Sequence, residues 1–127
     1  DRVTTNGTIN VDKFIQHAKD FKYVNIAVSI EGGKDVNTYI RYPSNWDTIL
    51  QNFDKLSEYK NFEVVFNSTM NALNVGKFTK MRKDIAKRKW RIGNVIRNNA
   101  PWEVSSIPDD VREIYLNDLY EFGVNKV

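Results

Sequence analysis

Apolar residues along this chain follow two alternating spacings. Short runs of Val, Ile and Phe, each closely followed by Asn or Gly, are typical of strands. They occur at residues 2–5, 24–30, 62–66 and 91–96. Between and after them, apolar residues recur every three or four positions, as on one face of a helix. These segments are residues 11–21, 46–56, 77–91 and 111–122. Asn10 and either Ser44 or Asn45 are suited to cap the first two helices.

The alternation of strands and helices implies a parallel sheet joined by right-handed crossovers. We expect one α/β domain over residues 1–127, with the order βαβαβαβα. Two architectures fit this order: an open doubly wound sheet, or four consecutive units of a (β/α)₈ barrel, which is a partial or half TIM-type barrel. In both, ligands bind at the carboxyl ends of the strands. Residues 6–7, 29–33 and 67–71 are therefore expected to converge on one rim.

Three further segments carry signals of their own. Residues 39–45, which contain Pro43, are expected to form a connector. The strand at residues 62–66 is apolar on both faces, which predicts that both faces are covered. An irregular stretch through Pro101 and Pro108 should precede the last helix, and Gly123 should end that helix.

Composition limits the chemistry that this polypeptide can perform. Apolar residues make up 41% of the chain and aromatic residues 13%, enough for one soluble domain with a core. There is no cysteine, which excludes disulfides, thiol nucleophiles and cysteine-ligated zinc or iron–sulfur centres on this chain. The single histidine, His17, lies in the first predicted helix, away from the strand ends, and we assign no catalytic or metal-ligating residue.

Nothing in the sequence predicts contact with a membrane. No apolar run approaches the roughly 20 residues needed to cross a bilayer. The N-terminus, which begins Asp1-Arg2-Val3, has no signal-peptide pattern. We therefore expect a cytoplasmic location.

Positive charge is concentrated in one segment. The formal net charge is +3, but residues 77–91 contain eight Lys or Arg residues and one Asp, so the rest of the chain is net negative. A basic helix carrying Lys83, Lys87 and Arg88 is suited to a phosphate backbone, and Trp90 and Trp102 could stack on bases. The simpler interpretation of this run is a solvated helix face.

Polar residues at the predicted strand ends are candidates for ligand binding. Asn6 could bond to a ligand on the rim, or could simply form a turn with Gly7. Ser29 and Glu31 point to the same face, and a carboxylate beside two glycines can accept hydrogen bonds from ribose-type hydroxyls. Arg41 could clamp an anion, or could pack on a neighbouring tyrosine. Neither G-x-G-x-x-G nor a Walker A motif is present.

In their order along the chain, these segments resemble the radical S-adenosylmethionine (SAM) superfamily, specifically its peptide-modifying and phage-borne twitch or SPASM-type members. Residues 5–8 and 29–33 resemble the ends of the family's third and fourth barrel strands, with Glu31 where Asp is usual. Residues 37–41 and the helix at 45–56 resemble its Asp-x-x-Arg loop and the helix that follows. Residues 67–74 fall where the fifth strand ends, and residues 94–108 look like the sixth strand and the segment that leaves the barrel. The resemblance covers most of the chain.

The resemblance implies a set of residues around SAM. Ser29 and Glu31 would contact its ribose or methionyl part, and Arg41 would lie toward the substrate. Asn6, Thr69 and Asn71 would lie on or near the cofactor rim. The family's first strand, its CxxxCxxC cluster loop and its glycine-rich motif should precede residue 1. Without cysteine, this polypeptide holds no [4Fe–4S] cluster and cannot itself run radical chemistry.

Two explanations fit a partial barrel that begins directly with a strand. The chain is either the C-terminal part of a larger enzyme, with the missing N-terminal barrel half as its partner, or a short product with another role. In both, the inner sheet face and first strand edge would be exposed unless a partner covers them, which predicts self-association or an open-sheet rearrangement. The leading functional hypothesis is a catalytically incomplete radical SAM-like domain with weak SAM binding. The alternative is a small non-enzymatic module that uses the basic helix at 77–91 to bind nucleic acid or an acidic partner.

Overall fold

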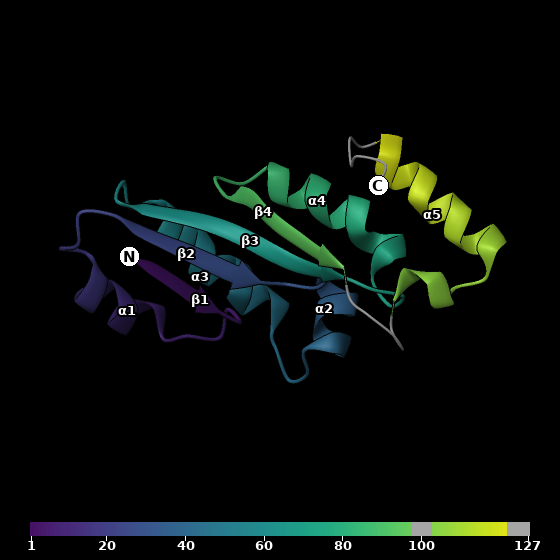
Figure 1. Cartoon of the computed structure of the whole chain (residues 1–127). Helices are drawn as coiled ribbons and strands as arrows, with labels where there is room; N and C mark the ends of the chain where they lie inside the picture. The colour runs from purple at the N-terminus through teal and green to yellow at the C-terminus, as the bar shows by residue number, and fades with distance from the viewer. Residues whose placement is uncertain (98–102, 122–127) are drawn as a thin grey trace.

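Four parallel strands form one sheet in the order in which they occur along the chain. The computed structural model describes residues 1–97 and 103–121, without the side chains at positions 92, 94–97 and 121. The strands are β1 (Arg2–Thr5), β2 (Val24–Ser29), β3 (Phe62–Met70) and β4 (Arg91–Arg97). Their order in the sheet is β1-β2-β3-β4, and all three pairings are parallel (Figure 1). The predicted α/β class and the four predicted strands are confirmed.

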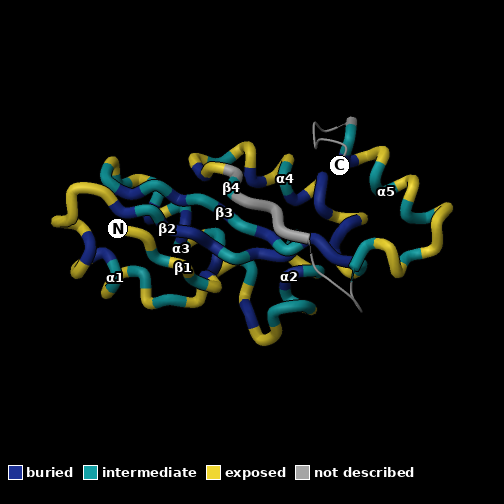
Figure 2. The backbone as a smooth tube through the Cα atoms, in the orientation of Figure 1, coloured by how far each residue is buried: buried dark blue, intermediate teal, exposed yellow. Residues whose placement is uncertain are grey.

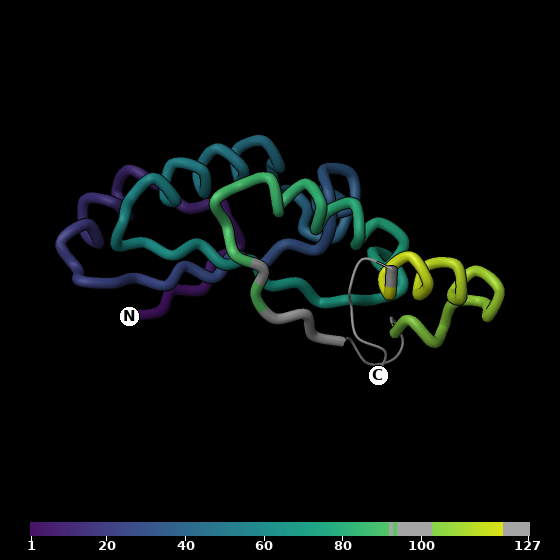
Figure 3. Tube along the Cα trace, turned by 90° about the horizontal axis from the view of Figure 1, so that it is seen from above, coloured from purple at the N-terminus to yellow at the C-terminus, as the bar shows by residue number. Residues whose placement is uncertain are grey.

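The helices that connect the strands lie on one side of the sheet. The helices are α1 (Val11–Ala18), α2 (Lys34–Ile40), α3 (Trp46–Ser57), α4 (Phe78–Ala86) and α5 (Asp109–Glu121), with short 3₁₀ turns η1 (Val75–Lys77) and η2 (Val104–Ser106). Helices α1 to α4 lie behind the sheet in Figure 1 and above it in Figure 3. A doubly wound sheet would carry helices on both faces. The arrangement is therefore that of consecutive units of a (β/α) barrel, which form a partial barrel.

The core lies between the sheet and this helix layer. Along β3, residues alternate strictly between buried and half-buried positions. The buried side packs against Ile49, Phe53 and Leu56 of α3 in one apolar cluster. Figure 2 shows the buried stretches along β2 and β3. The expectation that both faces of this strand are covered was wrong, because the other face carries the half-buried Val65 and no helix within the described residues lies over it.

We call this uncovered side of the sheet the open face. Strand register and alternation assign to it a set of mostly polar or small residues. They are Arg2, Thr4, Asn25, Ala27, Ser29, Glu63, Val65, Asn67, Thr69 and Arg91. The inner sheet face of the half barrel thus has no helix over it among the described residues, although most of its side chains are half-buried and Ala27 is fully buried. Its described side chains are chiefly polar rather than apolar.

Local signals explain where the predicted helices begin, and where the prediction was wrong. The side chains of Asn10 and Asn45 each accept a hydrogen bond from the backbone three residues on, at 3.0 Å, and cap α1 and α3. Helix α2 was missed, since its seven residues are too few to show an apolar period. Tyr39 and Ile40, which were expected in the connector, belong to this helix.

The basic helix is shorter than the predicted range 77–91. It spans Phe78–Ala86, and Trp90 then turns inward, with its ring 5.6 Å from that of Phe53 in an edge-on contact. The apolar stripe of the basic segment is therefore shared between α4 and Trp90, which lies directly before β4. Helix α5 agrees with the last predicted helix, whereas Pro101, Trp102, Phe122 and Gly123 lie outside the described residues. In residues 1–97 and 103–121, no helix combines the length and apolar character needed to cross a bilayer.

The turn after β1 depends on Gly7, as the Asn-Gly dipeptide predicts. Gly7 has a φ of 90°, and its backbone N–H donates to the Thr5 hydroxyl at 3.1 Å. The amide of Asn52 on α3 donates to the carbonyls of Gly7 and Ile9 at 3.2 and 3.3 Å. This turn therefore ties the first strand to the helix layer.

We predict that Gly7→Ala destabilises the protein by about 2–4 kcal/mol. A left-handed backbone is unfavourable for alanine, and the added Cβ would lie within 3.0 Å of Ile49 and Phe53. Urea unfolding measures the change. Gly33→Ala is the matched control, because a Cβ there meets no atom within 4 Å, and its stability should stay within about 1 kcal/mol of the wild type. Equal effects of the two substitutions would contradict the argument.

Candidate functional site

The carboxyl ends of β2 and β3 bring several of the predicted site residues together. Ser29 and Asn67 are paired across the two strands, and the backbone N–H of Ile30 donates to the Asn67 carbonyl at 3.0 Å. Glu31 lies two residues after Ser29, beyond the end of β2, and Thr69 lies two residues after Asn67, within β3. We use the name rim cluster for Ser29, Glu31, Arg41 and Thr69, which come from three segments that are distant in sequence.

Glu31 is the centre of the rim cluster. It is only 4% exposed. Its Oε1 accepts from Arg41 Nη2 at 2.5 Å and from Arg41 Nε at 3.2 Å, and its Oε2 accepts from the backbone N–H of Thr69 at 3.0 Å. One carboxylate therefore joins the end of β2 to β3 and to the C-cap of α2. A buried carboxylate is stable only with such partners.

Asn37 is a buried residue of the site that sequence reasoning missed. Its Oδ1 accepts from the backbone N–H of Glu31 at 2.9 Å, and its Nδ2 donates to the Ser44 hydroxyl at 3.3 Å. Both Asn37 and Ser44 are buried. Only the resemblance to the Asp-x-x-Arg loop pointed to this segment, since an asparagine in a polar stretch has the same sequence appearance whether it is buried or exposed.

Asn6 and Arg41 line one shallow pocket at the same end of the molecule. The pocket has a volume of about 540 Å³. Its lining residues are Asn6, Thr8, Ile40, Arg41, Tyr42, Pro43 and Ser44. Asn6 Oδ1 accepts from the backbone and hydroxyl of Thr8 at 3.1 and 2.8 Å. Arg41 thus belongs both to the pocket lining and to the rim cluster, with its side chain 30% exposed.

Asn71 has a structural role in the turn after β3. Its Oδ1 accepts from the backbone N–H of Leu73 at 2.9 Å, and its own backbone N–H donates to Asn74 Oδ1 at 2.8 Å. The Nδ2 groups of Asn71 and Asn74 both donate to the Thr69 carbonyl, at 3.4 and 2.7 Å. The two asparagines therefore fix the backbone of Thr69 from the opposite side to Glu31.

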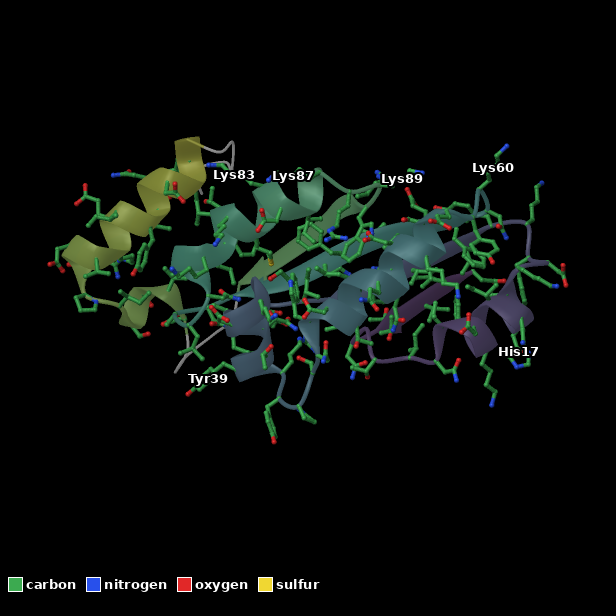
Figure 4. All side chains as sticks on the ribbon, turned by 180° about the vertical axis from the view of Figure 1, so that it is seen from behind. His17, Tyr39, Lys60, Lys83, Lys87 and Lys89 are labelled. Atoms are coloured by element: carbon green, nitrogen blue, oxygen red, sulfur yellow. The ribbon has the colours of Figure 1, made fainter. Side chains whose placement is uncertain are left out.

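The basic residues of the alternative hypothesis lie along the sheet edge beside β4. Lys83, Lys87 and Lys89 project along this edge together with Lys60 (Figure 4). Arg88 pairs with Asp54 and lies over the Trp90 ring at 5.7 Å, and Lys87 lies 3.8 Å from Asp84. His17 is exposed on α1, at the end of the molecule away from Tyr39.

A second polar cluster lies on the open face, at the opposite end of the strands. Glu63 accepts hydrogen bonds from the Tyr23 hydroxyl, from Asn25 Nδ2 at 2.8 Å and from Arg91. These bonds favour the charged form, so the pKa of Glu63 is lowered from 4.5 to about 2, with the bond from Tyr23 the largest cause and those from Arg91 and Asn25 next. Register places Asn25 directly beside Glu63, an arrangement that sequence alone did not indicate.

Comparison with known proteins adds no assignment to these sites. A scan against models of protein families found no match, and a search of curated proteins found none either. Among the described residues, no group of three or more His, Cys, Asp or Glu side chains is arranged to hold a metal ion. The functional interpretation therefore depends on the residues themselves.

We predict that Glu31→Gln lowers the free energy of unfolding by about 2–4 kcal/mol, because it leaves Arg41 and the half-buried backbone N–H of Thr69 without their charged acceptor. Chemical denaturation measures the loss. Asp47→Asn is the control, since it breaks the ion pair between Asp47 and Lys34, whose side chains are 62% and 65% exposed respectively. Its loss of unfolding free energy should stay below about 1 kcal/mol. If the two variants lose the same stability, Glu31 does not hold the strand ends together.

Stability should also depend on pH through Glu63. The unfolded chain binds this proton near pH 4.5 and the folded chain only near pH 2. The contribution of Glu63 is therefore complete above about pH 4.5 and is lost as the pH falls toward about 2. Urea midpoints between these values should fall less steeply in Glu63→Gln than in the wild type. Glu58→Gln, which removes an exposed carboxylate with no hydrogen bond to another described residue, should keep the wild-type slope.

Proposed function

We propose that this chain is part of a radical SAM-type barrel and that its rim cluster binds the ribose or methionyl part of SAM. One observation carries the proposal: the hydroxyl-bearing Ser29 and Thr69 lie at the carboxyl ends of adjacent parallel strands, beside the Glu31–Arg41 pair. In barrels of this type, the carboxyl ends of the strands are where ligands bind. The order of the motifs along the chain supports the same identification.

The hydrogen-bonding capacity of the rim cluster fits such a ligand. Neither the Ser29 hydroxyl nor the Thr69 hydroxyl bonds to another residue in the described part of the chain, so both can serve a ligand on the open face. Arg41 uses two of its five N–H groups on Glu31 and keeps others for an anionic group such as a carboxylate. Glu31 positions Arg41, and with a side chain only 6% exposed it acts through that residue more than by direct contact.

The other predicted contacts fit unequally. Asn6 lines the pocket that Arg41 borders, with no acceptor for its Nδ2 among residues 1–97 and 103–121, and suits a position on the ligand rim. Asn71 is buried, and its side chain bonds to the backbone of its own turn. We therefore propose Asn71 as a residue that positions Thr69 rather than as a ligand contact.

The part of this chain in catalysis would be binding and orientation. An iron–sulfur cluster supplies the electron that cleaves SAM in this superfamily, and the 127 residues contain no cysteine to hold one. The residues at the rim would hold the sugar and amino-acid parts of the cofactor, and Arg41 would fix a negatively charged group of cofactor or substrate. The proposal thus concerns a binding surface, and binding is its test.

Isothermal titration with SAM and with S-adenosylhomocysteine should show saturable binding to the full chain. Ser29→Ala and Thr69→Val should each weaken it by about 3- to 10-fold, the equivalent of one hydrogen bond. Thr4→Val is the matched control, because Thr4 carries a hydroxyl on the same open face but further from the rim, and its affinity should equal that of the wild type. Absence of binding, or equal losses in all three variants, would overturn the proposal.

The alternative, a nucleic-acid module based on α4, has weaker support. Its lysines do lie along one edge of the molecule (Figure 4). However, two of the three residues in that hypothesis, Lys87 and Arg88, already pair with carboxylates of this chain. Lysines beside an edge strand also have a simpler purpose, since they discourage edge-to-edge pairing of sheets.

A further inference from the structure

A groove runs between α3 and α4 on the helix side of the molecule, away from the rim cluster. Its volume is about 770 Å³. Its floor is apolar, with Leu50 of α3 on one side and Met81 and Ile85 of α4 on the other. Trp46 and Val36 complete the floor near the start of α2. A groove of this kind between two helices is suited to the apolar face of a third helix.

The rim of the groove is net positive. Six Lys or Arg residues line it against four Asp or Glu residues. Two of the carboxylates, Asp54 and Asp84, already pair with Arg88 and Lys87 of the same rim. Lys77, Lys80 and Lys89 make no ion pair with any residue in the described ranges. Asp35 and Glu58 also line the groove without an ion pair to a described residue, so its lining carries both signs of charge with a net formal charge of +2.

Two of the unpaired lysines lie at a helix N-terminus, where positive charge is unfavourable. Lys77 and Lys80 stand at the beginning of α4, whose first turn has no acidic residue. The partial positive charge at a helix N-terminus favours anions there and repels cations. Carboxylates from another molecule would offset the repulsion between these lysines and the helix N-terminus. The groove therefore favours an acidic occupant.

The outer face of α5 has the complementary character. This helix contains five Asp or Glu residues and one Arg. Asp110, Glu113 and Asp118 are exposed and make no ion pair with another described residue, whereas Asp109 pairs with Arg112. Between them Ile114, 66% exposed, presents an apolar side chain to solvent. At helical spacing these four residues share one face.

We propose that two copies of this chain associate by seating the outer face of α5 from one copy in the α3–α4 groove of the other. Ile114 would enter the apolar floor, and the carboxylates of Asp110, Glu113 and Asp118 would meet the lysines of the rim. The 13 residues of α5 extend about 20 Å, which matches the 12 residues of α3 along one wall of the groove and exceeds the nine residues of α4 along the other. The proposal is independent of SAM binding and uses a different side of the molecule.

The geometry of the contact has a consequence for symmetry. The groove and the acidic face are different surfaces of one chain, so a single contact leaves one groove and one acidic face unoccupied. In one form, each of two copies places its α5 in the groove of the other, which gives a closed dimer. In the other form, the contact repeats along a row of copies. Both forms contain the same pair of surfaces, and the same substitutions disrupt both.

Sedimentation velocity of the full chain tests the proposal. Association should increase with protein concentration up to about 0.5 mM, and should weaken when salt is raised from about 0.05 M to about 0.5 M. Lys80→Glu and Glu113→Lys should each weaken association by about tenfold, because like charges would then face one another. Lys83→Glu is the matched control, since it makes the same charge change on α4 at a position that does not line the groove, and it should associate as the wild type does.

The decisive step is to mix the two charge-reversed variants. Lys80→Glu and Glu113→Lys should associate with each other in equimolar mixture about as tightly as the wild type, because the reversed charges again match, although each variant alone associates about tenfold more weakly. Circular dichroism first establishes that both variants are folded. A monomeric wild type at the highest concentration, or no recovery in the mixture, would overturn the proposal. So would association that survives both reversals and is instead lost in Val65→Glu, which alters the open face.

Discussion

The handedness of the crossovers is the constraint on which the rest of this structure depends. Each strand is parallel to the one before it, and each lies beside it in the sheet. A right-handed connection between neighbouring parallel strands returns over the same face every time. All the intervening helices, and with them the apolar core, are therefore confined to one side. The other side needs no apolar residues, which explains why Asn25, Ser29 and Glu63 can lie there without cost.

The same constraint explains how much of the fold the sequence could predict. Strict alternation in residues 24–30, and apolar spacing after Asn10 and Asn45, are local signals, and the elements that they predict are present. Whether a helix covers a given face of the sheet is not a local property of the sequence. Val65 is apolar, and nothing nearby in the chain reveals that its face lacks a helix. Helix α2 has no apolar period and depends on tertiary contacts, in particular on the burial of Asn37.

The site shows a similar division. Asn6, Ser29, Glu31 and Thr69 could be predicted to lie at one end of the molecule, because strand ends in a parallel sheet converge. Their partners could not be predicted. Arg41 and the Thr69 backbone N–H take up both oxygens of Glu31, so the carboxylate that looked most like a ligand contact is chiefly the joint between segments. The same is true of Asn71, whose amide and carbonyl close the turn after β3.

The sequential strand order also affects how the chain acquires its structure during synthesis. Each of β2, β3 and β4 pairs with the strand directly before it in the chain, so its partner has already been synthesised when it emerges. From β1 to β4 the sheet can therefore grow one unit at a time. Each added helix then closes over the strand pair beneath it and removes that apolar surface from solvent before the next unit emerges.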